Sequence, residues 1–281
     1  MITLTCVVED SPAPPLKHEH GLAIWIETPE GNALFDTGGS SGVLMHNMTS
    51  LGFEPSMLDA VALSHAHYDH TGGLPALLSR LPAGTPLYAH PTLFRARYSD
   101  HRKGPRRKGL GAVNLTQEQL AARLDLRLSA EPQEILPGVW TTGEIRSRPY
   151  AEGRSARHTV IEDGEHVPDP YTDDLSLVLE TDTGIFLLCG CCHAGLLNTL
   201  AKVRNCWDAP IVGIGGGTHL NKASQATLDK TVAALKGMDA LKVAWLGHCS
   251  GEAFLAATRE MLGPVRFRRC KGGTKITSQE S

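Results

Sequence analysis

The sequence predicts an α/β fold in which strands lead into helices and parallel strands end at a common edge. Three observations support this prediction. Short apolar segments alternate with helical segments along the chain. In the second half, the order apolar strand, small residues, histidine, helix recurs. No linker of low complexity divides the chain, so we expect residues 1–281 to form a single domain built from two strand–helix halves.

Composition and charge are those of a globular protein without a strong electrostatic preference. Hydrophobic residues make up 41% and charged residues 20% of the 281, and the formal net charge of −3 gives no reason to expect nucleic acid or an anionic membrane as partner. No apolar run approaches the ~18 residues that span a bilayer, and Met1 to Glu9 lacks the basic start of a signal peptide. Seven cysteines, three of them at positions 189, 191 and 192, favour reduced thiols in a cytoplasmic protein.

The first half of the chain alternates strands with one clear helix. A strand opens the chain at Met1 to Val8, and a hairpin follows with strands at Leu22 to Glu27 and Ala33 to Phe35. The apolar run Met57 to Leu63 predicts a buried strand that leads into a polar loop. After that loop we expect a helix over residues 73–81 and a short strand over residues 87–89.

The strongest functional signal lies in the loop after the strand at residues 57–63. His65, His67, Asp69 and His70 place three imidazoles and one carboxylate within six residues, at a strand end where open α/β sheets hold their sites. This donor set suits a first-row metal ion such as zinc, iron or manganese. His65 and His67 lie two residues apart and can point the same way, whereas Asp69 and His70 lie where the chain turns and could reach a second ion.

Three strand ends in the second half carry further metal-competent side chains. A hairpin at residues 175–189 and strands at 211–214 and 243–246 are followed by His193, His219 and His248. Helices are expected at residues 195–203, 222–235 and 252–262. Because parallel strands end at one edge of a sheet, we expect these histidines to converge with the ligands of the first half.

The segments between these strands carry less specific signals. Thr116 to Arg123 predicts a helix capped by Thr116, and residues 133–142 predict two strands. Residues 144–170 are interpreted as a long surface excursion, so His158 and His166 are expected to be loop histidines rather than ligands. Asp36, followed by glycines, is either an orienting partner of a ligand histidine or part of a turn that requires glycine.

A basic insert near residues 94–115 stands out in a slightly acidic chain. It carries Arg95, Arg97 and six further arginine, lysine and histidine residues up to Lys108. One interpretation is a lid that attracts an anionic substrate, and the other is a solvated loop. The insert lacks the interleaved aromatic residues typical of RNA binding, so nucleic acid is not an expected partner.

The motif at residues 65–70 resembles the His-x-His-x-Asp-His signature of the metallo-β-lactamase superfamily. Further motifs are similar to one branch of it, the 7,8-dihydropterin-6-yl-methyl-4-(β-D-ribofuranosyl)aminobenzene 5′-phosphate synthase-like proteins, and lie at residues 19–22, 35–38, 190–195, 216–220 and 247–251. The similarity extends from about residue 19 to 262. It implies a four-layer αβ/βα metallo-β-lactamase sandwich with a mono- or dinuclear metal centre at one edge.

Two positions depart from the pattern common in that superfamily. Cys191 follows Gly190 where many members carry a bridging aspartate, and the histidine usual before the paired strands is missing, with Asp173 and Asp174 in its neighbourhood. Either a thiolate or a carboxylate substitutes at these positions, or one metal position is weak. Cys191 is therefore either a soft ligand or a buried thiol that packs as a small hydrophobe.

The resemblance implies one or two divalent metal ions, with zinc as the expected ion and iron or manganese as alternatives. The ligands expected for a first ion are His65, His67 and His193. Those expected for a second ion are Asp69, His70 and either His248 or His219. Asp69 is also the expected catalytic base. Additional candidates for ligation or substrate contact are His219, Cys191, Asp173 and His20.

These features predict a metal-dependent hydrolase that acts on a small anionic, phosphorylated substrate. The resemblance also implies a synthase reaction, in which an arylamine displaces pyrophosphate from a dihydropterin methyl diphosphate. An alternative from another class is a non-catalytic metal- or ligand-binding sensor, or a redox protein, on the same fold. Redox members of the superfamily usually carry a flavodoxin domain, for which these residues leave no room. No oligomeric state is predicted.

Overall fold

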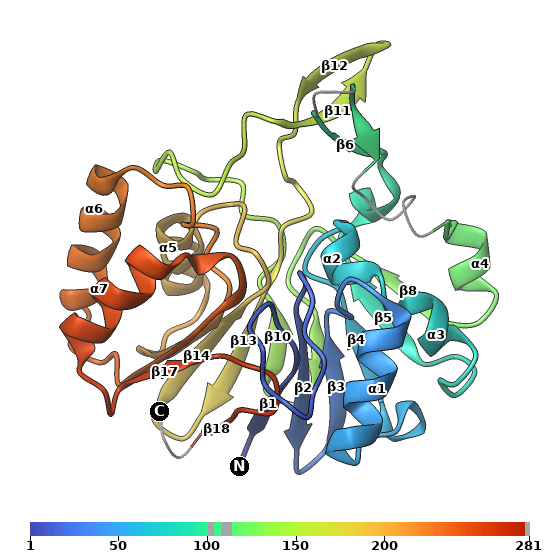
Figure 1. Cartoon of the computed structure of the whole chain (residues 1–281), viewed down its shortest axis with the longest axis horizontal. Coiled ribbons are helices and arrows are strands. Elements are labelled where there is room, and N and C mark those ends of the chain that lie inside the picture. Colours follow the sequence, from blue (N-terminus) through green and yellow to red (C-terminus); the bar gives the residue numbers. More distant parts are fainter. Residues whose placement is uncertain (101–103, 108–113, 279–281) are drawn as a thin grey trace.

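The structure is a computed structural model that describes residues 1–100, 104–107 and 114–278. Two seven-stranded sheets lie face to face in its centre, and helices cover the outer face of each (Figure 1). The predicted α/β class and the four-layer αβ/βα arrangement are confirmed.

The first sheet combines the N-terminal strands with the C-terminal one, in the order β18-β1-β2-β3-β4-β5-β8. Strands β1 to β3 and β18 pair antiparallel, whereas β3, β4, β5 and β8 run parallel. The parallel strands bring the end of β4 to an edge of the sheet, where the loop with His65 begins. The bounds are β1 Thr3–Val8, β2 Ala23–Thr28, β3 Gly31–Phe35, β4 Ala60–Ala62, β5 Pro86–Ala89, β8 Asp125–Leu128 and β18 Lys275–Thr277.

The second sheet has the order β17-β16-β15-β14-β13-β10-β9. Strands β14 to β17 run parallel, as the alternation of strands and helices predicted, and β9, β10 and β13 add antiparallel pairs. Three parallel strands therefore end side by side at the edge that carries His193, His219 and His248. The bounds are β9 Glu134–Leu136, β10 Val139–Thr141, β13 Ser176–Thr181, β14 Gly184–Cys189, β15 Ile211–Gly216, β16 Val243–Leu246 and β17 Phe267–Arg269.

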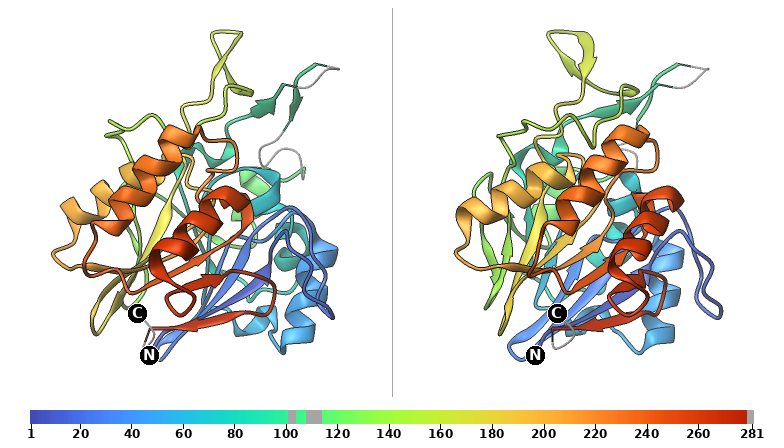
Figure 2. Two further views of the ribbon diagram at one scale, coloured as in Figure 1. Left: turned by 60° about the vertical axis from the view of Figure 1, so that its left-hand side comes forward. Right: turned by 90° about the vertical axis from the view of Figure 1, so that its left-hand side faces the viewer.

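Three apolar clusters hold the layers together. One lies between the sheets and joins Ile24 and Phe35 to Leu188 and Trp245. The other two lie between each sheet and its helices, which Figure 2 shows from the side of α5 to α7. Burial of these faces is the main force that holds the layers together. The bounds are α1 Ser41–Leu51, α2 Tyr68–Thr71, α3 Leu74–Leu78, α4 Gln117–Ala121, α5 Leu196–Cys206, α6 Gln225–Lys236 and α7 Glu252–Leu262, with 3-10 turns at Pro55–Met57, Pro91–Phe94 and His248–Ser250.

A small third sheet projects from the two central sheets, as Figure 1 shows near its top edge. It has the order β12-β11-β6-β7, and all its pairs are antiparallel. The bounds are β6 Arg97–Ser99, β7 Arg106–Arg107, β11 His158–Glu162 and β12 Glu165–Pro168. The prediction of a surface excursion at residues 144–170 was thus incomplete, because its second half forms this hairpin. The parts of the basic insert at 101–103 and 108–113 lie outside the described residues.

The sequence did not predict four elements of the two large sheets and their helices. They are α1, α2, β8 and β18, and each makes contacts distant in sequence. In α1, the buried Asn47 donates its side-chain amide to the backbone oxygens of Val7 and Lys17, which fixes the helix against β1. The predicted strand from Met57 is shorter, because Pro55–Met57 forms a 3-10 turn. The cap that Thr116 was expected to form on α4 is confirmed as a capping box with Gln119.

No helix in the described part of the chain combines the length and the apolar character that crossing a membrane requires.

Candidate metal centre

His65, His67 and His193 form the first of two clusters of candidate ligands. Nε2 of His65 lies 3.0 Å from Nδ1 of His67, and one ring nitrogen from each of the three histidines lies within 4.8 Å of the others. All three side chains are buried. His65 and His67 come from the loop after β4, and His193 comes from the loop after β14, so the two sheets meet at this cluster.

Neighbouring groups orient two of these rings, those of His65 and His193, through the nitrogen that does not face the cluster. Nδ1 of His65 lies 2.8 Å from the Ser64 hydroxyl, and Nδ1 of His193 lies 3.1 Å from the backbone oxygen of Gly153. Asp173 accepts a hydrogen bond of 2.8 Å from the backbone nitrogen of Ala66, between the two histidines. His65 and His193 therefore each present a defined nitrogen to the cluster, because a contact to the other ring nitrogen orients a ligand histidine in metal sites.

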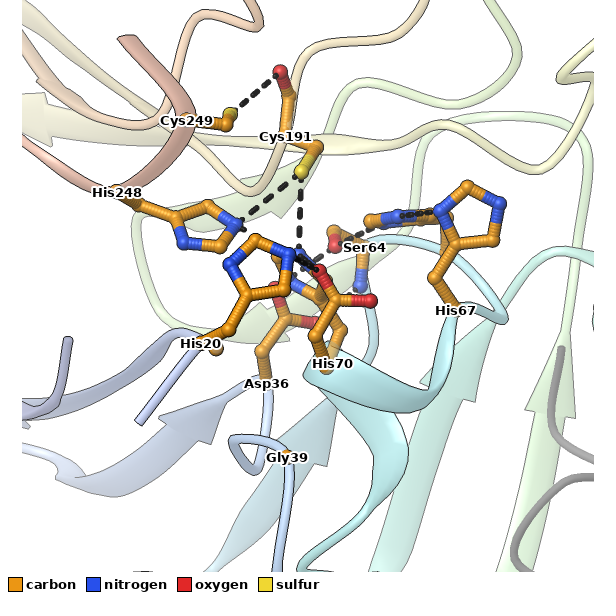
Figure 3. Close-up of polar contacts among 12 residues, drawn as sticks. His20, Asp36, Gly39, Ser64, His67, His70, Cys191, His248 and Cys249 are labelled. Carbon is orange, nitrogen blue, oxygen red and sulfur yellow. Dashed lines mark hydrogen bonds and ion pairs between the residues drawn. The ribbon is translucent and has the colours of Figure 1, made fainter. Parts of the chain in front are cut away.

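Asp69, His70, Cys191 and His248 form the second cluster. The Cys191 sulfur lies 3.2 Å from Nε2 of His70 and 3.3 Å from Nε2 of His248. Oδ2 of Asp69 lies 3.6 Å from Nε2 of His70 and 3.9 Å from Nε2 of His248. Neighbouring donors around a tetrahedral zinc ion lie about 3.3–3.8 Å apart. Figure 3 shows His70 and His248 directed at the Cys191 sulfur.

A buried or half-buried carboxylate supports each histidine of the second cluster. Asp36 Oδ2 lies 2.6 Å from Nδ1 of His70, and Asp10 Oδ1 lies 2.6 Å from Nδ1 of His248. In both rings Nε2 remains for the cluster, which is the carboxylate–histidine arrangement typical of metal ligands. Of the two interpretations of Asp36, the structure supports the orienting partner. The sequence did not predict Asp10, because its contact with His248 spans 238 residues.

The charges around His248 strongly perturb its protonation. Burial lowers the pKa of His248, but the charges of Cys249, Asp10 and Asp69 outweigh burial and raise that pKa to about 10. Burial would raise the pKa of the Cys249 thiol, but its hydrogen bond with Cys191 and the charge of His248 lower it well below the usual range. Such a pairing of groups with shifted pKa values is typical of functional sites.

The loops at this edge adopt backbone conformations that are rare for residues with side chains. Asp36, Cys192, His219 and His248 have φ angles of 60°, 62°, 50° and 48°. These left-handed conformations cost free energy, and they cluster at sites where side chains must be aimed. Gly72 is required by close approach, because a Cβ there would collide with the backbone oxygen of Gly39.

A cavity of about 520 Å³ opens above both clusters, and His67, Asp69, His193 and Cys191 line part of it. Its lining also contains three basic side chains, which are Arg154, Arg157 and Lys222. Arg157 is tied to the backbone oxygen of Asp100 by two hydrogen bonds. Arg154 and Lys222 are exposed.

Two described arginines of the basic insert, Arg95 and Arg97, face other partners. Arg97 is buried and pairs with Asp169 at 3.2 Å and with Asp173 at 2.7 Å, and Arg95 pairs with Glu162 at 2.6 Å. The lid interpretation does not hold for these two residues, because Arg97 pairs with internal carboxylates and Arg95 pairs with the β11–β12 hairpin. The cations at the cavity come instead from residues 154–157 and from Lys222.

Of the additional candidates, three lie at the cavity and one does not. His20 is 51% exposed at the rim, and its Nε2 lies 3.2 Å from Asp69. His219 and Cys191 line the cavity and share a further group of donors with Cys249. Asp173 is engaged by Ala66 and Arg97 and supports the ligand loop from behind. It belongs to none of the ligand groups among the described residues.

Sequence reasoning missed His158 and Tyr171 as parts of the site. The His158 ring lies 5.0 Å from that of His67, and its Nδ1 lies 2.7 Å from the Tyr171 hydroxyl. Tyr171 stacks on His193 with ring centroids 4.3 Å apart. His158 begins β11, and the pairing of β11 with β6 places this histidine beside the first cluster. No local sequence pattern predicts that pairing.

A family model described as the metallo-beta-lactamase superfamily matches residues 17–248. The chain belongs to the metallo-β-lactamase superfamily. A Methanocaldococcus jannaschii protein named 7,8-dihydropterin-6-methyl-4-(beta-D-ribofuranosyl)-aminobenzene-5'-phosphate synthase is 29% identical over 84% of this chain and 83% of its own length. An uncharacterized protein of the same organism, MJ0448, is 30% identical over 86% of this chain and 87% of its own. The resemblance derived from the sequence is thereby confirmed.

Solved structures support the same metallo-β-lactamase fold. Tm1679, described as a metal-dependent hydrolase of the beta-lactamase superfamily, covers 99% of both chains with a TM-score of 0.83 and 24% identity. Zinc-bound PqqB from Methylobacterium extorquens covers 98% of this chain and 99% of its own, with a TM-score of 0.59 and 11% identity. At these identities the likeness concerns the fold. The buried nitrogen, oxygen and sulfur donors described above independently suit a first-row divalent ion.

Proposed function

We propose that this chain is a metal-dependent enzyme that acts on a small phosphorylated substrate, with hydrolysis as its leading reaction. The observation that carries the proposal is the pairing of two buried ligand clusters with a cavity whose lining includes three cations. Anionic substrates are attracted to such a basic cavity, and arginine is suited to phosphate oxygens.

The two clusters define the proposed ligand sets. His65, His67 and His193 would hold one divalent ion, and Asp69, His70, Cys191 and His248 a second. Zinc is the ion that this mixture of imidazole, carboxylate and thiolate suits best, with iron or manganese as the alternatives. Cys191 thus acts as a ligand in this proposal, in the place where related proteins commonly use aspartate.

An ion bound there would supply Lewis acidity toward a phosphoryl oxygen and lower the pKa of nearby water. The chain itself would supply the remaining functions. Arg154 and Lys222 would bind the anionic group at the cavity, and Arg157 is already positioned by Asp100. Asp69 is buried below His20 and would take the proton of the attacking nucleophile as general base.

A synthase reaction is the second candidate, and the M. jannaschii relative favours it by its name. In that reaction an amine, rather than water, would attack, and pyrophosphate would leave. The two reactions are separated by one assay series with the metal-loaded protein. A panel of phosphomonoesters, phosphodiesters and lactones tests hydrolysis by release of phosphate or acid. A dihydropterin methyl diphosphate with an arylamine tests synthesis by release of pyrophosphate.

Metal content tests the proposed centre without any substrate. We expect the His67→Ala variant to lose metal at one site while its circular dichroism spectrum stays unchanged. His166→Ala is the matched control, since His166 lies exposed on β12 and contacts Thr159. Metal content equal to that of the unaltered protein in the His67→Ala variant would refute the ligand assignment.

A further inference from the structure

A third group of donors lies beside the two clusters and includes Cys249, which was not among the predicted ligands. Cys191, His219 and Cys249 each offer one donor atom within 4.8 Å of the other two, and all three line the cavity. The backbone nitrogen of His219 donates to the Cys249 sulfur at 3.2 Å, and that sulfur lies 3.6 Å from the backbone oxygen of Cys191.

The register of the second sheet builds this group. Cys189 of β14 pairs with Gly216 of β15, and Gly216 pairs with Leu246 of β16. The strands therefore end level with one another. Cys191 follows the first strand end by two residues, and His219 and Cys249 follow the other two by three each. Three adjacent strand ends thus deliver three donors to one place.

Gly217 leaves room for the Cys249 sulfur and the neighbouring His248 ring. A Cβ on Gly217 would lie 2.8 Å from the Cys249 sulfur and 3.2 Å from Cδ2 of His248, closer than side chains ordinarily pack. Both thiols are buried. Nδ1 of His219 is also buried, and it has no hydrogen-bond partner in the described part of the chain. A buried nitrogen of this kind is costly unless something binds it.

The donor set differs in chemistry from the two clusters already described. Two sulfurs and one nitrogen form a soft set, which favours zinc, cadmium or cuprous ions over magnesium, calcium or manganese. Donors within 4.8 Å need to close by about 1 Å to reach the spacing around a tetrahedral ion.

We propose that Cys191, His219 and Cys249 form a thiolate-rich metal position of their own. It shares Cys191 with the Asp69–His70–His248 group, and the cavity provides its open coordination position. Binding requires both sulfurs as thiolates, so each S–H proton still present passes to solvent as its metal–sulfur bond forms, without any change of oxidation state. The position does not depend on the proposed hydrolase or synthase activity, because it needs no substrate.

Cadmium titration of the reduced, metal-stripped full chain tests this position, with thiolate-to-metal absorption in the near ultraviolet as the readout. We expect the Cys249→Ser variant to bind one cadmium equivalent fewer and to lose about half of this absorption. Cys206→Ser is the control, because Cys206 is exposed on α5, and it should match the unaltered protein. We expect His219→Ala to weaken cadmium binding by more than about 100-fold, beyond the usual effect of an outer-shell partner.

Two outcomes overturn the proposal. One is a Cys249→Ser variant that keeps its circular dichroism spectrum, the full cadmium stoichiometry and the full absorption. The other is a Cys191–Cys249 disulfide that resists reduction in the folded chain, detected by alkylation. His67→Ala separates this proposal from the proposed function. If His67→Ala retains all its metal while Cys249→Ser loses an equivalent, the histidine centre fails and the thiolate position stands. The reverse pattern refutes only the thiolate position.

Discussion

The two halves of the chain deliver their donors to the same edge in opposite ways. The first half places four candidate ligands in one loop of six residues, from His65 to His70, directly after β4. The second half spreads its donors over three loops, each after a different parallel strand. Donors in one contiguous loop can be recognised as a group from the sequence. Donors dispersed over several loops can be recognised as a group only when the strand register is known.

The largest expected effect concerns the contiguous loop. Asp69→Asn removes the proposed base and a candidate ligand, so kcat on the substrate found by the panel should fall by about 10²–10⁴-fold. Asp182→Asn is the control, since Asp182 is exposed in the turn between β13 and β14 and should leave kcat unchanged. Activity retained in Asp69→Asn would move the base to another residue.

The second prediction tests the buried ion pairs of Arg97, which support the loop of His65 and His67 through Asp173. Arg97→Ala leaves the buried carboxylates of Asp169 and Asp173 without their cation, so the free energy of unfolding should fall by about 3–5 kcal/mol. Arg95→Ala removes a partly exposed pair with Glu162 and should cost less than about 1 kcal/mol. Urea denaturation measures both. Equal losses in the two variants would show that burial of the Arg97 pairs is unimportant.

The third prediction compares a histidine of each half, His70 and His248, through the carboxylate that orients it. Asp36→Asn and Asp10→Asn each weaken the orientation of one histidine, and metal affinity should fall by about 10–100-fold in each. The fall should be greater for Asp36, because its side chain is fully buried whereas that of Asp10 is 34% exposed. Competition with a chromogenic chelator gives both affinities. A larger effect at Asp10 would reverse the ranking by burial.

The smallest expected effect is on the number of protons released when metal binds. The pKa of His248, near 10 in the metal-free chain, means that its ring is protonated at pH 8, so metal bound at this nitrogen must displace a proton. Metal affinity should therefore rise with pH up to about 10. The raised pKa also implies that the metal-free fold loses stability as pH increases from about 6.5 to 10. Calorimetry at pH 8 in buffers of different protonation enthalpy should show less proton release for His248→Gln.

The sequence predicted most of the fold because its strands and its three long second-half helices are continuous periodic segments. It predicted the loop donors because they are adjacent in sequence. It did not predict Asp10, whose contact with His248 spans 238 residues, or Cys249, whose sulfur faces Cys191 only through the register of β14 to β16. A signal for Cys249 was present in the Gly-His-Cys-Ser-Gly segment, where a thiol follows a candidate ligand directly.

The absence of α1 and β18 from the prediction has the same cause. Ser41–Leu51 contains a glycine and side chains of mixed polarity, and its helix is stabilised by Asn47 reaching β1 and the following loop. The strand β18 has three residues and exists through its pairing with β1. In both cases a distant partner decides the local structure, which a window of sequence does not contain.

The buried Arg97 has a consequence for engineering the protein. It begins β6 in the projecting sheet, and through Asp173 it reaches the backbone of Ala66 between the two ligand histidines. The base of that sheet is therefore anchored to the ligand loop, whereas the tip of the β11–β12 hairpin at residues 162–165 lies beyond this anchor. We therefore expect the tip to accept loops of other lengths while the anchor and the ligand histidines stay in place.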